Sequence, residues 1–132
     1  MTTELFWLTL TALMTALFWV PYILNRIAVQ GMTEAMSYPT ADTPEQSEWA
    51  KRAMKAHYNA AENLVVFAPL VLTLHVAGLS NGLTATAAAV YFFARLVHYL
   101  VYLGGVPVVR TLAFAVGWAA QVAIALVILG IL

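Results

Sequence analysis

Two otherwise apolar stretches of this sequence carry polar and charged side chains at intervals of three or four residues. The two sets are Lys55, Asn59 and Glu62 in the first stretch, and Arg95, His98 and Tyr102 in the second. Residues at this spacing lie on one face of an α-helix, so each set predicts a polar stripe. Ionisable side chains are costly in contact with lipid and usually face the interior of a helical bundle. The two stripes therefore predict a polar site inside such a bundle.

The charges in and around these stripes indicate what the site would bind. Four cations, Arg26, Lys55, Arg95 and Arg110, are set against one nearby acid, Glu62. A guanidinium group pairs well with a carboxylate, and hydroxyl and amide side chains hydrogen-bond peptide groups. The residue types therefore predict an anionic ligand with several hydrogen-bonding groups.

Glu62 and Arg95 are expected to lie at the same depth in the bilayer. A short Ser80-Asn81-Gly82 turn joins the two stretches into an antiparallel hairpin. Counting 1.5 Å per residue from this turn places both side chains within about one helical turn of the same level. We expect them to form an ion pair, within one chain or between chains, because an unpaired charge at that depth costs several kcal/mol.

The elements that must position these residues follow from composition. Of the 132 residues, 63% are hydrophobic and 9% charged, whereas a soluble domain is about 45–50% apolar and about 25% charged. The chain is therefore expected to be an integral membrane protein. Its net charge of zero excludes a nucleic-acid-binding surface. Its lack of cysteine excludes disulfides, a thiolate metal site and a cysteine nucleophile.

Four apolar runs are long enough to cross a bilayer. They are residues 4–24, 58–78, 83–103 and 111–132. The fold class predicted is all-α, an integral membrane four-helix bundle in a single domain, 1–132. We expect run 4–24 to be a retained helix, because it has neither a basic flank nor a small-residue cleavage site. Thr43 as N-cap and Pro44 as first residue predict that the second helix starts at about 44 and extends into the cytoplasm.

The basic residues set the orientation. With four spans, one side of the membrane carries Arg26, Lys51, Arg52, Lys55 and Arg110, and the other side carries no lysine or arginine. The positive-inside rule places the basic side in the cytoplasm. Both termini are then expected on the non-cytoplasmic side.

Two motifs resemble those of a known family. The run from Arg52 to Pro69, RAMKAHYNAAENLVVFAP, resembles the second-helix signature of the MAPEG family, the membrane-associated proteins in eicosanoid and glutathione metabolism. The series Arg95-x2-His98-x3-Tyr102, followed by Arg110, is similar to the third-helix series of that family. The resemblance covers nearly the whole chain and is to a bacterial-type member, which implies the bacterial inner membrane.

The resemblance implies a homotrimer of four-helix subunits, with glutathione as cofactor between neighbouring subunits near the cytoplasmic face. Carried over by position, the residues that hold the tripeptide are Asn59, Glu62, Arg95, His98 and Tyr102. Glu62 would grip the γ-glutamyl amine, and Arg26 and Lys55 would meet the carboxylates. Arg110 would stabilise the thiolate. Lys55 stands where eicosanoid-type members usually have Arg, and His98 where many members have Tyr.

Three functions remain open at this point. The first is a glutathione-dependent transferase or peroxidase that acts on lipophilic electrophiles delivered by the bilayer. The second is a non-catalytic accessory or lipid-binding member of the same family. The third is a small proton-coupled multidrug exporter. Such exporters carry an essential Glu within the first span, and the absence of an acid between residues 5 and 24 counts against this reading.

Overall fold

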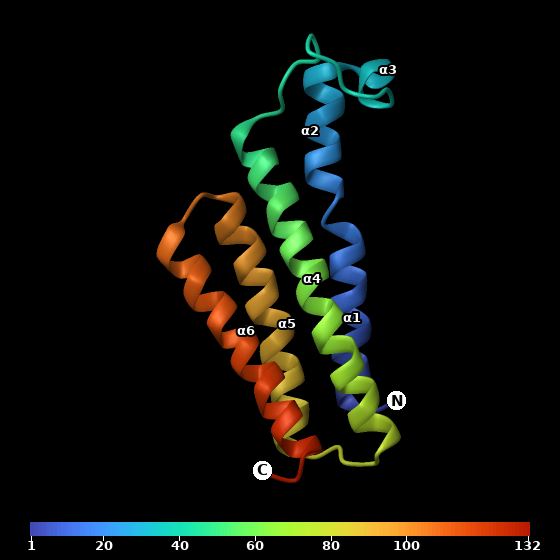
Figure 1. The fold of residues 1–132 in the computed structure, drawn as a ribbon, viewed down its shortest axis with the longest axis vertical. Helices are drawn as coiled ribbons and strands as arrows, with labels where there is room; N and C mark the ends of the chain where they lie inside the picture. Colours follow the sequence, from blue (N-terminus) through green and yellow to red (C-terminus); the bar gives the residue numbers. More distant parts are fainter.

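The computed structural model describes all 132 residues and contains helices but no strands. The helices are α1 (Thr3–Leu17), α2 (Val20–Gln30), α3 (Met32–Ala35), α4 (Glu48–Val76), α5 (Gly82–Leu103) and α6 (Pro107–Ile128) (Figure 1). Four helical segments are long and apolar enough to span a membrane, with α1 and α2 together forming the first. The predicted all-α membrane bundle of four helices is confirmed.

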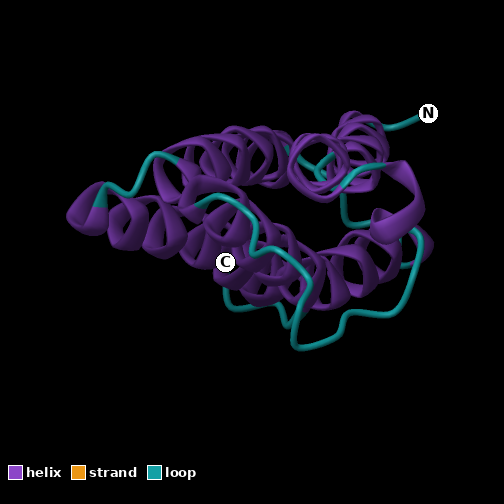
Figure 2. Ribbon diagram, turned by 90° about the horizontal axis from the view of Figure 1, so that it is seen from above, coloured by secondary structure: helices purple, strands orange, loops and turns teal.

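Helices α4 and α5 form the centre of the bundle. Each packs against α1 and α6 as well as against the other, and the pair α5 and α6 is the most closely packed. Seen from above, the ribbons form two rows along the bundle (Figure 2). Near the chain termini the core is built around the stacked rings of Phe67 and Tyr91, whose centroids are 3.8 Å apart.

A stripe of alanines lets the first span lie close to α4. Its members, spaced three or four residues apart and all buried, are Ala50, Ala53, Ala56 and Ala60. Small residues at such intervals allow two helix backbones to approach within a membrane. Phe18 and Tyr22, on the first span, pack into the same cluster. This contact brings α2 beside the part of α4 that carries the predicted polar stripe.

The first span is not the single continuous helix expected over residues 4–24. It breaks between Leu17 and Val20 and then continues as α2. Pro21 has no N–H to donate to the preceding turn, which favours a break at this point. The Tyr99 hydroxyl on α5 donates to the Phe18 carbonyl at 3.0 Å, and the two rings stack with centroids 3.8 Å apart. Tyr99 thus satisfies a carbonyl at the break and fixes the position of α2.

Helix α4 starts later than the sequence pattern indicates. Thr43 and Pro44 were expected to begin it, but the first helical residue is Glu48 and the N-cap is Ser47. The Thr43 hydroxyl instead donates to Glu34 at 2.8 Å. Asn25 on α2 accepts a hydrogen bond from the Ser47 backbone N–H at 3.2 Å. Contacts with α2 and α3 therefore hold this segment in an extended path and outweigh the local capping signal.

A buried carboxyl group links α1 to α5 at the other end of the bundle. Glu4 in the first turn of α1 is only 3% exposed, and it accepts a hydrogen bond from the Thr84 hydroxyl at 2.5 Å. Thr84 also belongs to the capping box that starts α5, in which Asn81 accepts from its backbone N–H at 3.0 Å. Both chain termini lie at this end, opposite α3 and the turn between α5 and α6 (Figure 1).

Candidate functional site

Four of the predicted site residues line one hollow between α4, α5 and α6. We call it the Arg110 hollow; it has a volume of about 270 Å³. Its lining is Asn59, His98, Tyr102, Arg110, Thr111 and Phe114. The side chains come from the middle of α4, the last two turns of α5 and the first two turns of α6. The α5–α6 turn thus brings polar groups from two helix ends to one place.

Arg110 is held against an aromatic ring in this hollow. Its guanidinium carbon lies 4.7 Å from the centroid of the Tyr102 ring, within the range of a cation–π interaction. The Tyr102 ring in turn meets His98 edge-on, with centroids 5.6 Å apart. Arg110 forms no salt bridge with any carboxylate of the chain. Its positive charge is therefore uncompensated and available to an anion in the hollow.

Arg95 lies behind the wall of the hollow and does not line it. It is 2% exposed, and its Nη2 donates to Asn59 Oδ1 at 2.6 Å and lies 3.3 Å from His98 Nδ1. Its Nε is buried without a hydrogen-bond partner. A buried guanidinium with two such contacts orients the groups that it bonds. Arg95 therefore positions Asn59 and His98 from behind.

Two further predicted residues, Arg26 and Lys55, line a separate hollow at the same end of the bundle. This basic hollow, of about 650 Å³, lies between α2, α4 and the segment that precedes α4. Lys51 and Arg52 supply its other two cations. Arg26, Arg52 and Lys55 form no salt bridge. These three free cations make the hollow suited to anionic groups.

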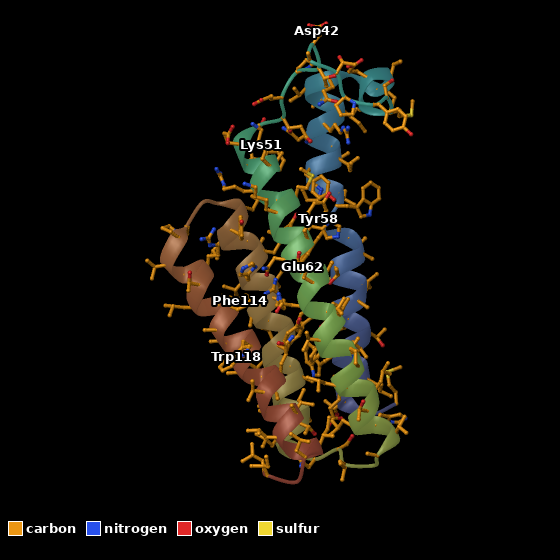
Figure 3. The ribbon with its side chains drawn as sticks, viewed as in Figure 1. Asp42, Lys51, Tyr58, Glu62, Phe114 and Trp118 are labelled. Atoms are coloured by element: carbon orange, nitrogen blue, oxygen red, sulfur yellow. The ribbon has the colours of Figure 1, made fainter.

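Lys51 differs from the other three cations because its charge is already neutralised. Its Nζ lies 2.7 Å from Glu45 and 3.1 Å from Glu48. The hydrogen bond from Lys51 and its charge lower the pKa of the Glu45 carboxyl below the usual value. Figure 3 shows Lys51 near the start of α4, above Tyr58 and Glu62. Lys51 is therefore part of a surface ion pair and is not proposed as a ligand-binding group.

The ion pair expected between Glu62 and Arg95 is not formed within the chain. Glu62 is exposed, whereas Arg95 is buried and directs its Nη2 to Asn59, one turn earlier on α4. Matched depth did not produce contact, because α4 is rotated so that Asn59 and not Glu62 faces α5. Figure 3 labels Glu62 about midway along α4. Glu62 is an unpaired acid on the surface of the chain, within a segment able to span the membrane.

Sequence reasoning assigned no site role to Arg52. Its Nε donates to the carbonyl of Leu103 at 3.0 Å, at the end of α5. The only signal was its position three residues before Lys55, on the same face of the helix. Phe114 and Thr111 were also missed, because nothing in an apolar span marks which side chains face a hollow.

Comparison with known families shows which family the chain matches. A family model described as the MAPEG family matches residues 5–130. The match includes both polar stripes, Arg26, Arg110 and the turn between α5 and α6. No curated protein matches the chain.

Proposed function

Because the chain belongs to the MAPEG family, we propose that it is a glutathione-dependent membrane transferase or peroxidase that acts on lipophilic electrophiles. The observation that carries this proposal is the Arg110 hollow. There an unpaired guanidinium group, held over Tyr102, stands beside the hydrogen-bonding groups of Asn59 and His98. A cation in such a hollow suits the binding of a thiolate.

Arg110 is proposed as the group that activates the thiol. A free thiol has a pKa of about 8.5, so it is mostly protonated and weakly nucleophilic at neutral pH. A guanidinium group nearby stabilises the thiolate and lowers that pKa. The proton passes to water, and the thiolate sulfur attacks the electrophile. In the transferase reaction, a C–S bond forms while the leaving group departs with its electron pair.

The remaining predicted residues would hold the tripeptide. Asn59, His98 and Tyr102 present amide, imidazole and hydroxyl groups to the Arg110 hollow. We propose that they bind the peptide groups of glutathione. Arg95 supports them from behind through Asn59 and His98. The carboxylates are assigned to the basic hollow, where Arg26 and Lys55 lie.

We propose that the site is completed in a homotrimer. Within one chain the two hollows are separate, and Glu62 lies outside both. An exposed carboxylate in a membrane-spanning helix needs a polar partner. Contact between subunits would cover Glu62, where it would bind the γ-glutamyl amine between neighbouring chains.

A third hollow is consistent with the proposal that the second substrate is lipophilic. It lies between α4 and α6 and has a volume of about 420 Å³. Most of its lining is apolar: Val66, Leu70, Trp118, Val122 and Ala125, with Asn63 and Gln121. Phe114 of the Arg110 hollow and Trp118 lie one turn apart on α6 (Figure 3). An apolar molecule from the bilayer could therefore lie along α6 with its reactive end near Arg110.

The proposed glutathione site also implies an orientation of the chain in the membrane. We propose that the basic end, with the two polar hollows, faces the cytoplasm and that both termini lie on the other side of a bacterial inner membrane. The segment 27–43 would then lie in the cytoplasm beside the basic hollow.

Calorimetric titration of the purified protein in detergent with glutathione tests the proposal. Saturable binding together with turnover of an activated aryl halide or a lipid hydroperoxide is expected. Binding without turnover of any electrophile would favour the alternative, a non-catalytic accessory or lipid-binding member of the family. Absence of binding would contradict the glutathione site.

A further inference from the structure

Arg52 connects the basic hollow to the turn between α5 and α6. Its Nε donates to the carbonyl oxygen of Leu103 at 3.0 Å. This carbonyl belongs to the last turn of α5, whose carbonyl groups have no partner within the helix. No other side chain forms a hydrogen bond with residues 103–106. A cation at this position also complements the negative end of the helix dipole.

The guanidinium group packs directly against the turn. A Cβ atom at Gly105 would lie 3.4 Å from both Cζ and Nε of Arg52. Gly105 has a φ of +76°, which favours glycine. The turn is closed by its own backbone bonds, from Gly105 N–H to Tyr102 and from Val106 N–H to Val101. Arg52 therefore fixes the turn from the side of α4.

This turn sets the position of the proposed catalytic cation. Tyr102 lies in the last turn of α5, and Arg110 lies in the first turn of α6. Their cation–π contact spans the turn. A shift of the turn would change the distance between the Arg110 guanidinium and any group bound in the Arg110 hollow.

The same Arg52 side chain lines the basic hollow beside Arg26 and Lys55. A guanidinium group is planar and holds its five N–H donors in a fixed geometry. One donor, Nε–H, is used on Leu103, and no carboxylate of the chain occupies the others. An anion that accepts from the remaining donors would fix the plane of the group and so the Nε contact.

We propose that Arg52 is a positioning residue that couples the two hollows: an anionic group bound in the basic hollow tightens the α5–α6 turn and so fixes Arg110. This inference rests on the proposed function, because it assigns the carboxylate end of the tripeptide to one hollow and its thiol to the other. It makes thiol activation depend on the carboxylates of the same ligand. A thiol without carboxylates would bind near a less well placed Arg110.

Hydrogen exchange at the turn tests this coupling directly. The measurement is the exchange rate of the backbone amides of Gly105 and Val106, with the protein in lipid nanodiscs. In Arg52→Lys the charge remains but the planar donor is lost, and exchange in the absence of ligand should be roughly fivefold faster. Arg52→Gln is a second variant in case the first does not fold. Lys55→Gln is the matched control, because Lys55 lines the same hollow without touching the turn, and its ligand-free exchange should equal that of wild type.

Two anions separate this proposal from the proposed function. Glutathione and inorganic phosphate should each slow turn exchange in wild type, relative to sodium chloride at equal ionic strength, and neither should do so in Arg52→Lys. At saturating glutathione, Arg52→Lys should also raise the pKa of the bound thiol and lower kcat about fivefold. If phosphate slows exchange but glutathione does not bind, the coupling stands and the glutathione function fails. If both anions bind, and exchange and thiol pKa are the same in wild type and Arg52→Lys, the coupling is overturned.

Discussion

The guanidinium group of Arg110 lies 4.7 Å from the centroid of the Tyr102 ring, across the turn that joins α5 to α6. This contact holds a cation with no acidic partner at the edge of a polar hollow in a membrane bundle. Because the two residues are on different helices, their geometry depends on the turn and on whatever supports it.

Loss of the Tyr102 ring should release Arg110. Tyr102→Leu is expected to lower kcat/KM for glutathione conjugation about tenfold, since a cation–π contact shielded from water contributes about 1–2 kcal/mol. Tyr102→Phe keeps the ring and should retain most of the activity, apart from any contribution of the hydroxyl to binding. Steady-state kinetics with an activated aryl halide measures both variants. Equal losses of kcat/KM in Tyr102→Phe and Tyr102→Leu would show that the hydroxyl matters and the ring does not.

Substitutions of Arg95 and Asn59 should have coupled effects on the free energy of unfolding, because the two side chains share a hydrogen bond. Asn59→Leu leaves a buried guanidinium without its shortest hydrogen bond, which should cost about 1.5–3 kcal/mol. Arg95→Met removes the charge, and the double variant should be more stable than the sum of the two single losses predicts. Thermal unfolding in detergent measures all three, with Thr111→Val on the exposed start of α6 as control. Additive effects would mean that the bond contributes nothing.

The link between Glu4 and Thr84 should stabilise the end of the bundle where the chain termini lie. Thr84→Val leaves the buried Glu4 without its hydroxyl donor and should cost about 1–3 kcal/mol. Thr86→Val is the matched control, because its exposed hydroxyl bonds only the carbonyl of Gly82 within its own helix. Similar unfolding temperatures for the two variants would contradict a structural role for Glu4. Glutathione affinity should be unchanged in both, because this end is remote from the two polar hollows.

Glu62 should be covered on assembly. Native mass measurement in detergent should give three times the subunit mass, and Glu62→Leu should bind glutathione at least tenfold more weakly, because it lacks the carboxylate proposed to bind the amine. Asp42→Asn, which removes an exposed acid that lines neither polar hollow, serves as control. A stable monomer that binds glutathione with wild-type affinity would exclude a site shared between subunits.

Much of this arrangement could be predicted from the sequence, because the bilayer restricts the options. Apolar runs of sufficient length must be helices, and polar residues at helical spacing within them must share a face. These rules led to the four spans and to the grouping of Asn59, His98, Tyr102 and Arg110. A family resemblance, and not spacing, supplied the roles of these residues.

Two features that the sequence did not predict depend on contacts between helices. Matched depth predicted an ion pair between Glu62 and Arg95, and within the chain this pair is absent, because the rotation of α4 about its axis places Asn59 toward α5 and leaves Glu62 outside. Rotation is set by packing of the whole alanine stripe and cannot be read from two positions. The start of α4 failed for a similar reason, since Asn25 on α2 holds Ser47 in place and outweighs the cap signal at Thr43.

In the proposed mechanism, Arg110 lowers the pKa of a bound thiol. Thiolate formation is followed by ultraviolet absorbance near 240 nm while the pH of the glutathione complex is varied. In wild type the bound thiol should titrate below about 8.5, so that thiolate is present at neutral pH. In Arg110→Ala the tripeptide should bind within about tenfold of wild type, with a thiol pKa close to about 8.5. The same thiol pKa in wild type and in Arg110→Ala would contradict a role for Arg110 in thiol activation.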